Sequence, residues 1–227
     1  MIFRQLFDKA SSTYTYLVAS DKGREALVID PVLENVDSYI QLLKELDLKL
    51  VKVIDTHIHA DHITAASKLK NETNCTTIMG EHTPSNIVEI KIKNDEVIYV
   101  EDLKIRAIYT PGHTKDSYSF LMNDYLFSGD TLLINGTGRT DFQGGSSKDS
   151  YNSIFNKLLK LPDETLLYPA HDYNGKKVSS IGKEKKFNPR LQVRSVNEYI
   201  DIMNNLNLSK PNLMDLNVDR NIKLGNI

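Results

Sequence analysis

Histidines and aspartates in this sequence are concentrated in four short motifs whose residue types could bind a metal ion. The first is Thr56-His57-Ile58-His59-Ala60-Asp61-His62, which places four potential ligands within six residues. Neutral imidazole and carboxylate are both metal ligands. The others, in chain order, are Pro111-Gly112-His113-Thr114, Ser128-Gly129-Asp130-Thr131 and Pro169-Ala170-His171-Asp172. Because clustered carboxylates without a cation would repel one another, the four motifs together predict a metal site.

The residues alone are compatible with a centre of two metal ions that share Asp130. One ion would then bind His57, His59 and His113, and the other would bind Asp61, His62 and His171. A hydroxide that bridges two such ions is suited to hydrolysis. A di-zinc hydrolase is therefore one hypothesis from the ligand types.

Each motif is expected where a β-strand ends, and loops at strand ends position side chains rigidly. Segments rich in β-branched and aromatic residues predict strands at 2–7, 12–19, 25–31, 49–54, 76–79, 97–100, 103–109, 117–122, 125–128 and 165–168. Apolar residues at helical spacing predict helices at 35–47, 63–72, 149–159 (with Asp149 as the cap) and 193–206. Strands in two groups, each closed by helices, indicate an α/β fold of two packed sheets in a single domain over residues 1–227.

Composition argues against several classes of protein. The formal net charge of −2 gives no electrostatic footprint for nucleic acid. No segment approaches the ~18 apolar residues of a membrane helix, and residues 1–8 lack the features of a secretion signal. We therefore expect a cytoplasmic protein without nucleic-acid or membrane partners. The single cysteine, Cys75, is interpreted as a small buried hydrophobe, and His82 as an exposed loop residue.

A glycine-rich stretch contains Gly136, Gly138, Gly144 and Gly145. It is not a phosphate-binding loop, because no Gly-Lys-Ser/Thr follows. We interpret it as a loop that approaches the ligand closely.

Taken together, the four motifs resemble those of the metallo-β-lactamase superfamily. This resemblance implies an αββα sandwich, with two mixed sheets flanked by helices and the site at one edge of both sheets. Within the superfamily the chain is most similar to the persulfide dioxygenases (sulfur dioxygenases), which are related to glyoxalase II. The most specific segments are Gly138–Gln143, Tyr168–Tyr173, Asn188–Leu191 and Ile202–Leu206. One position departs from that family, because Thr137 stands where a cysteine is often found.

The resemblance implies one Fe(II) ion per chain, held by His57, His113 and Asp130. Two histidines and one carboxylate form the facial triad of non-haem iron oxygenases, which leaves positions open for substrate and O₂. Zinc has no redox chemistry and would not activate O₂. The remaining candidates would surround the ligands and orient them; they are His59, Asp61, His62 and His171.

The reaction implied by the resemblance is the oxidation of glutathione persulfide with O₂ and water to sulfite and glutathione. Arg139, Tyr173 and Arg190 match glutathione-binding positions of that family, and guanidinium pairs with carboxylate in a bidentate way. The alternative is a di-zinc hydroxyacylglutathione hydrolase with two Zn²⁺ ions. A metal-bearing binding protein without turnover is a third hypothesis. A homodimer is also compatible with the sequence.

Overall fold

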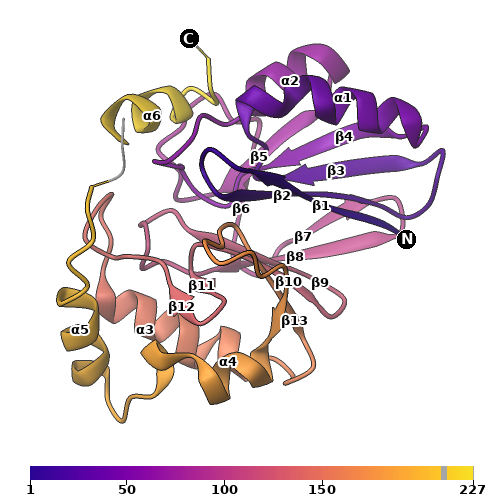
Figure 1. The fold of residues 1–227 in the computed structure, drawn as a ribbon. Helices are drawn as coiled ribbons and strands as arrows, with labels where there is room; N and C mark the ends of the chain where they lie inside the picture. The colour runs from indigo at the N-terminus through magenta and orange to yellow at the C-terminus, as the bar shows by residue number, and fades with distance from the viewer. Residues whose placement is uncertain (211–213, 227) are drawn as a thin grey trace.

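The computed structural model describes residues 1–210 and 214–226. Two six-stranded sheets lie face to face, with helices on the outer face of each (Figure 1). The strand orders are β1-β2-β3-β4-β5-β6 and β14-β13-β10-β9-β8-β7. Both sheets are mixed, since β3, β4, β5 and β6 pair in parallel in the first and β10 pairs in parallel with β13 in the second. The predicted αββα sandwich is thus confirmed.

The strands of the first sheet are β1 (Ile2–Asp8), β2 (Thr13–Ala19), β3 (Glu25–Ile29), β4 (Lys49–Ile54), β5 (Thr76–Gly80) and β6 (Ile90–Ile92). Those of the second are β7 (Val97–Val100), β8 (Leu103–Tyr109), β9 (Tyr118–Met122), β10 (Tyr125–Gly129), β13 (Leu166–Pro169) and β14 (Ser179–Ser180). A separate short pair consists of β11 (Leu132–Leu133) and β12 (Gly136–Thr137).

Helices α1 (Val36–Glu45) and α2 (Ala66–Thr73) cover the first sheet, and α3 (Ser147–Asn156), α4 (Ile181–Phe187) and α5 (Val196–Asn204) cover the second (Figure 1). The last helix, α6 (Met214–Asn221), contacts the His-rich loop through Asn221, and its Val218 packs against the apolar cluster beneath α1 and α2. Within the ranges that the structure describes, no helix is long and apolar enough to cross a membrane.

The apolar core lies partly between the two sheets and partly between each sheet and its helices, because strand side chains alternate between the two faces of a sheet. In β2, Tyr16 and Val18 enter the cluster between the two sheets, whereas Leu17 and Ala19 join the cluster beneath α1 and α2. A third cluster fills the space between the second sheet and helices α3 to α5. Burial on both faces explains why β2 reads as a continuous run of buried residues.

The differences from the sequence prediction concern short elements and helix ends. The prediction omitted β6, β11, β12, β14, α4 and α6. Helix α2 begins three residues later than predicted, because Thr64 forms a bridge with Val32 instead of a helical turn. The prediction that Asp149 caps α3 was wrong, since Ser146 is the cap and its hydroxyl accepts the Asp149 N–H at 3.2 Å.

Candidate metal centre and substrate cavity

The four motifs converge at one edge of the sandwich. His57 follows β4, His113 follows β8, Asp130 follows β10 and His171 follows β13. The structure therefore brings all the predicted ligand residues together, in two adjacent groups.

The first group consists of His57, His113 and Asp130, whose ligand atoms all lie within 4.8 Å of one another. His113 Nε2 is 3.5 Å from Asp130 Oδ2. The Nδ1–H of His113 donates to the carbonyl of Arg139 at 2.8 Å, which turns Nε2 toward Asp130. Asp130 Oδ1 is buried without a hydrogen-bond partner among the described residues. An unpartnered carboxylate oxygen beside two imidazoles fits a bound cation.

The second group consists of His59, Asp61 and His62, again with ligand atoms within 4.8 Å. His171 joins it, with Nε2 at 3.5 Å from Asp61 Oδ2 and 3.7 Å from Asp130 Oδ2. In the part of the chain that the structure describes, His59 Nδ1 and His62 Nε2 are buried and unpartnered. These orphaned nitrogens also fit a metal ligand set, so the donor geometry is compatible with one ion or two.

Electrostatics divide the histidines into two kinds. Burial, together with neighbouring histidines, holds the pKa of His57 and that of His59 well below the usual value, so both imidazoles are neutral. Burial also opposes the charge on His171, but Asp130 and Asp61 outweigh it and raise the pKa of His171 to about 10. Without a metal ion, a protonated His171 therefore offsets part of the negative charge of this group.

Sequence reasoning missed several residues that hold the first motif in place. Asp30 accepts the Thr56 N–H at 2.7 Å and lies 3.1 Å from His59 Nε2. The amide of Asn221, in α6, donates to the carbonyls of His59 and His62 at 2.8 Å. Asp30 carried a usable signal, because it is an acidic residue at the end of a strand, as in the other motifs. Asn221 carried none, since only the tertiary fold brings it to the loop.

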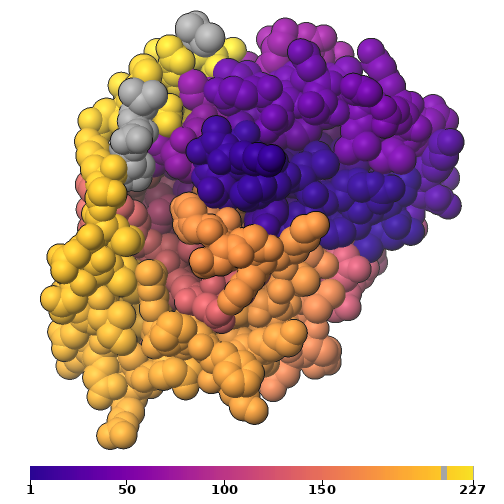
Figure 2. Space-filling model, in the orientation of Figure 1, coloured from indigo at the N-terminus to yellow at the C-terminus, as the bar shows by residue number. Residues whose placement is uncertain are grey.

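A cavity of about 580 Å³ opens beside the centre. Figure 2 shows this face, where the C-terminal segment in yellow and the segment after β13 in orange flank a hollow. Four of the candidate ligands reach the cavity, namely Asp61, His113, Asp130 and His171. All three residues predicted to bind substrate also line it; they are Arg139, Tyr173 and Arg190.

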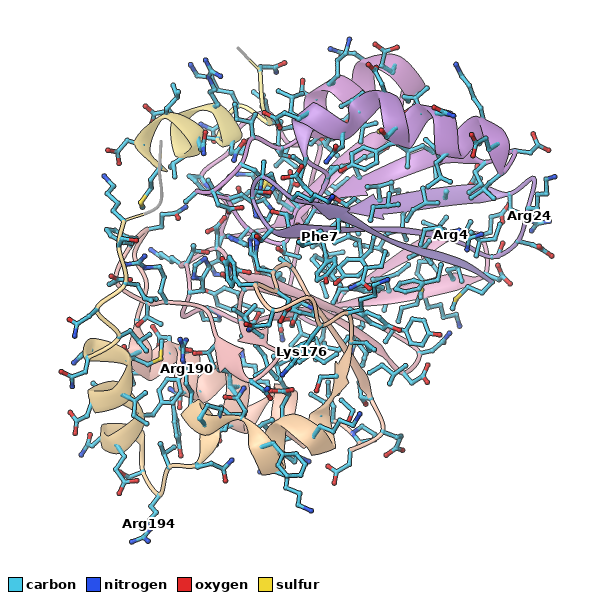
Figure 3. All side chains as sticks on the ribbon, viewed as in Figure 1. Arg4, Phe7, Arg24, Lys176, Arg190 and Arg194 are labelled. Carbon is cyan, nitrogen blue, oxygen red and sulfur yellow. The ribbon has the colours of Figure 1, made fainter. Side chains whose placement is uncertain are left out.

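The two arginines already have protein partners. Arg139 forms two bonds of 2.7 Å with the carboxylate of Asp141 and donates to the carbonyls of Leu208 and Ser209 at 3.1 and 2.6 Å. Arg190, labelled in Figure 3, donates through Nη1 to the carbonyl of Thr137 and to its hydroxyl. These bonds to Thr137 therefore hold the guanidinium group of Arg190 at the wall of the cavity.

Tyr173 and Thr137 complete this part of the cavity. The ring of Tyr173 is exposed and stacks on His171, with centroids 6.0 Å apart. Thr137, at the position that departs from the resembling family, is buried, and its hydroxyl accepts from Tyr199 at 3.3 Å. Thr137 thus links Arg190 to the packing of α5.

Two residues outside the site match their predicted character. Cys75 is buried, and burial raises the pKa of its thiol. His82 is exposed, and its ring stacks on Tyr109 with centroids 4.0 Å apart.

Comparison with known proteins agrees with this geometry. Residues 8–171 match the profile of the metallo-beta-lactamase superfamily. The mitochondrial persulfide dioxygenase ETHE1 of Homo sapiens is 40% identical, over 99% of this chain and 89% of that protein. The crystal structure of ETHE1 from Myxococcus xanthus superimposes with a TM-score of 0.97, at 48% identity, over 100% of both chains.

A hydroxyacylglutathione hydrolase of Dictyostelium discoideum is less similar, at 34% identity over 70% of this chain and 62% of that protein. The match to persulfide dioxygenases is both closer and longer. The chain therefore belongs to the metallo-β-lactamase superfamily and, within it, to the persulfide dioxygenase family.

Proposed function

We propose that this enzyme is an iron-dependent persulfide dioxygenase that oxidises glutathione persulfide with O₂ and water to sulfite and glutathione. The observation that carries the proposal is the group His57, His113 and Asp130, because two of its members, His113 and Asp130, line a cavity that two arginines and a tyrosine also line. The 40% identity to the human persulfide dioxygenase supports the persulfide as substrate.

We propose that His57, His113 and Asp130 hold a single Fe(II) ion. Bound there, iron supplies the redox chemistry with O₂ that zinc lacks. The protein prepares the ligands for it. The Arg139 carbonyl fixes the tautomer of His113, and burial keeps His57 neutral, so both imidazoles offer lone pairs.

The residues around these ligands have a separate role in this proposal. His59, Asp61, His62 and His171 orient the ligands and balance charge. The Nδ1–H of His171 donates to the Ser12 carbonyl at 3.2 Å, so its Nε2 faces the carboxylates of Asp61 and Asp130.

The glutathione part of the substrate would lie in the cavity. Its volume of about 580 Å³ suits a small organic molecule. Glutathione carries two carboxylates, for which Arg190 and Arg139 are the cationic partners. A guanidinium group has five N–H groups. In Arg139 four of them donate hydrogen bonds within the protein, so one remains for the substrate. The hydroxyl of Tyr173 is available to the peptide groups.

A second candidate function is the di-zinc hydrolysis of acylglutathiones. The unpartnered nitrogens of His59 and His62 favour it, because they offer ligands for a second ion. Reconstitution of the metal-free protein separates the two. One equivalent of Fe(II) should restore persulfide-dependent O₂ uptake, and two equivalents of Zn²⁺ should not. Zinc-dependent hydrolysis of lactoylglutathione, without O₂ uptake from the iron-loaded protein, would favour the hydrolase. The cytoplasmic location and the homodimer stay predictions.

A further inference from the structure

The segment Gly138–Gln143 contacts the surroundings of all three proposed ligands, although the proposed function uses only Arg139 from it. A Cβ atom on Gly138 would lie 2.0 Å from the Asp130 carbonyl and 2.9 Å from the His113 ring, so a side chain does not fit there. The next residue, Arg139, accepts the His113 Nδ1–H on its carbonyl. The start of the segment therefore packs directly against two ligands.

The end of the segment reaches the third ligand through a side-chain amide. Gln143 Nε2 donates to the carbonyl of Ile58 at 2.7 Å. Ile58 is 2% exposed and lies between His57 and His59. The backbone carbonyl of Gln143 accepts the Lys115 N–H at 3.3 Å, in the loop that carries His113. Gln143 therefore connects the two loops that supply the histidine ligands.

A second side chain holds the other polar group of Ile58. The Ile58 N–H donates to Asp116 Oδ2 at 2.9 Å, and Asp116 is 6% exposed. The N–H belongs to the peptide that joins His57 to Ile58, and the carbonyl belongs to the peptide that joins Ile58 to His59. Peptide groups are planar. Hydrogen bonds that hold the N–H and the carbonyl of Ile58 therefore also fix the directions in which the side chains of His57 and His59 project from the backbone.

The backbone of Gln143 adopts a strained conformation. Its φ is +49°, in the left-handed region that non-glycine residues seldom adopt. Such conformations persist where the surrounding structure enforces them, and they cluster at active sites. The next residue, Gly144, also has a positive φ, of +69°, which costs a glycine little.

We propose that Gln143 and Asp116 are positioning residues of the metal centre, which together set the place of His57 relative to His113 and Asp130. This inference rests on the proposed ligand set. Neither side chain is a ligand in it. Both act through the two peptide groups of Ile58, and removal of either bond lets the His57 loop shift away from the other two ligands.

The test is metal affinity, measured on the full chain by chelator competition with Co²⁺ as the probe. Gln143→Met keeps the length of the side chain and removes the donor. Substitution of residues that orient metal ligands typically weakens affinity about 10- to 100-fold, and we expect a loss in that range. The matched control is Gln192→Met, because the Gln192 amide also donates to two backbone carbonyls, those of Lys185 and Asn188, and does not line the cavity.

Asp116 supplies the rescue experiment. Asp116→Asn retains a carbonyl oxygen for the Ile58 N–H, so Co²⁺ affinity and the visible spectrum of the Co²⁺ protein should stay close to those of the parent. Asp116→Ala removes the acceptor and should weaken affinity and alter the spectrum. Thermal unfolding of each metal-free variant shows whether the fold is intact.

Two results would overturn the inference. One is a Gln143→Met protein that binds Co²⁺ as tightly as the parent, with the same spectrum. The other is an equal loss of affinity in Gln143→Met and Gln192→Met, which would indicate a general effect on stability. A different result would contradict the proposed function: the unsubstituted protein would bind the metal ion tightly and yet consume no O₂ with glutathione persulfide.

Discussion

The three proposed iron ligands differ from His171 in what their loss should do. His113→Ala should remove most bound iron and activity, because a centre with three protein ligands has no redundancy. His171→Ala should keep much of the iron and lower turnover, since His171 is proposed to act on its neighbours. Iron per chain and O₂ uptake, measured on the same samples, check this. Equal iron loss in both variants would make His171 a direct ligand.

The cavity arginines should affect substrate binding rather than metal content. A hydrogen bond to a charged group contributes roughly 1.5–3 kcal/mol, which corresponds to about 10- to 100-fold in affinity. Arg190→Ala and Arg139→Ala should therefore raise KM more than they lower kcat, because these groups are proposed to bind parts of the substrate remote from the sulfur. Arg190→Lys should recover little, since a point charge does not reproduce the guanidinium fork.

Steady-state O₂ uptake with glutathione persulfide measures these constants, with iron assayed as the control. Thr137→Val offers a further check, because it removes the hydroxyl that accepts from Arg190 and leaves the arginine itself. Like the arginine variants, Thr137→Val should raise KM for glutathione persulfide. If both arginine variants had the same KM as the unsubstituted protein, the glutathione site would lie elsewhere.

Among single residues, the sequence predicted those whose role follows from their own side-chain chemistry. Imidazole and carboxylate ligands are recognisable by type and spacing, so His57 and Asp130 could be predicted. Asp116 and Gln143 could not, because their role depends on a peptide group that only the fold brings near. The pairing of Arg139 with Asp141 was equally hidden, although the two residues are only two positions apart in the chain.

Among the elements, α5 offers a test of local stability that is separate from the metal centre. Its cap is Ser195, whose hydroxyl accepts the Glu198 N–H at 3.3 Å. Ser195→Ala should lower the free energy of unfolding by about 1 kcal/mol, as is typical for loss of a capping serine. Chemical denaturation measures this change. Metal content should be unaffected, and a loss of iron in this variant would mean that α5 supports the centre directly.

Elements were predictable where they are long enough to show a period. Strand β4 has the predicted bounds, Lys49–Ile54, since four of its six residues are apolar and it leads directly into the polar His-rich motif. Strands of two or three residues, such as β6 and β14, are too short to show alternation. Helix α4 has only two buried residues, Ile181 and Glu184, so its apolar face is too small to recognise. The predicted end of α5 was two residues late.

For the molecule as a whole, the single thiol of Cys75 reports on global stability. It is 2% exposed, and burial raises its pKa, so alkylation of the folded protein at pH 8 should be slow. In denaturant one equivalent should react rapidly. A ligand that binds only the folded state stabilises it by about 2.7 kcal/mol at a hundred times its Kd, so metal loading should slow labelling further.

Mass spectrometry of the labelled protein follows this reaction, and Cys75→Ser is the control without a thiol. Rapid labelling of the native protein would contradict the burial of Cys75. Labelling at the same rate with and without metal would mean that the metal ion does not stabilise the fold.

The central claim is that the chain couples O₂ reduction to persulfide oxidation at one iron. The most direct test measures O₂ consumed and sulfite formed by the iron-loaded protein with glutathione persulfide. We predict one sulfite per O₂, with no uptake when glutathione replaces the persulfide and none from protein loaded with zinc. An iron-loaded protein that consumes no O₂ with the persulfide, while the zinc-loaded protein hydrolyses lactoylglutathione, would contradict the claim.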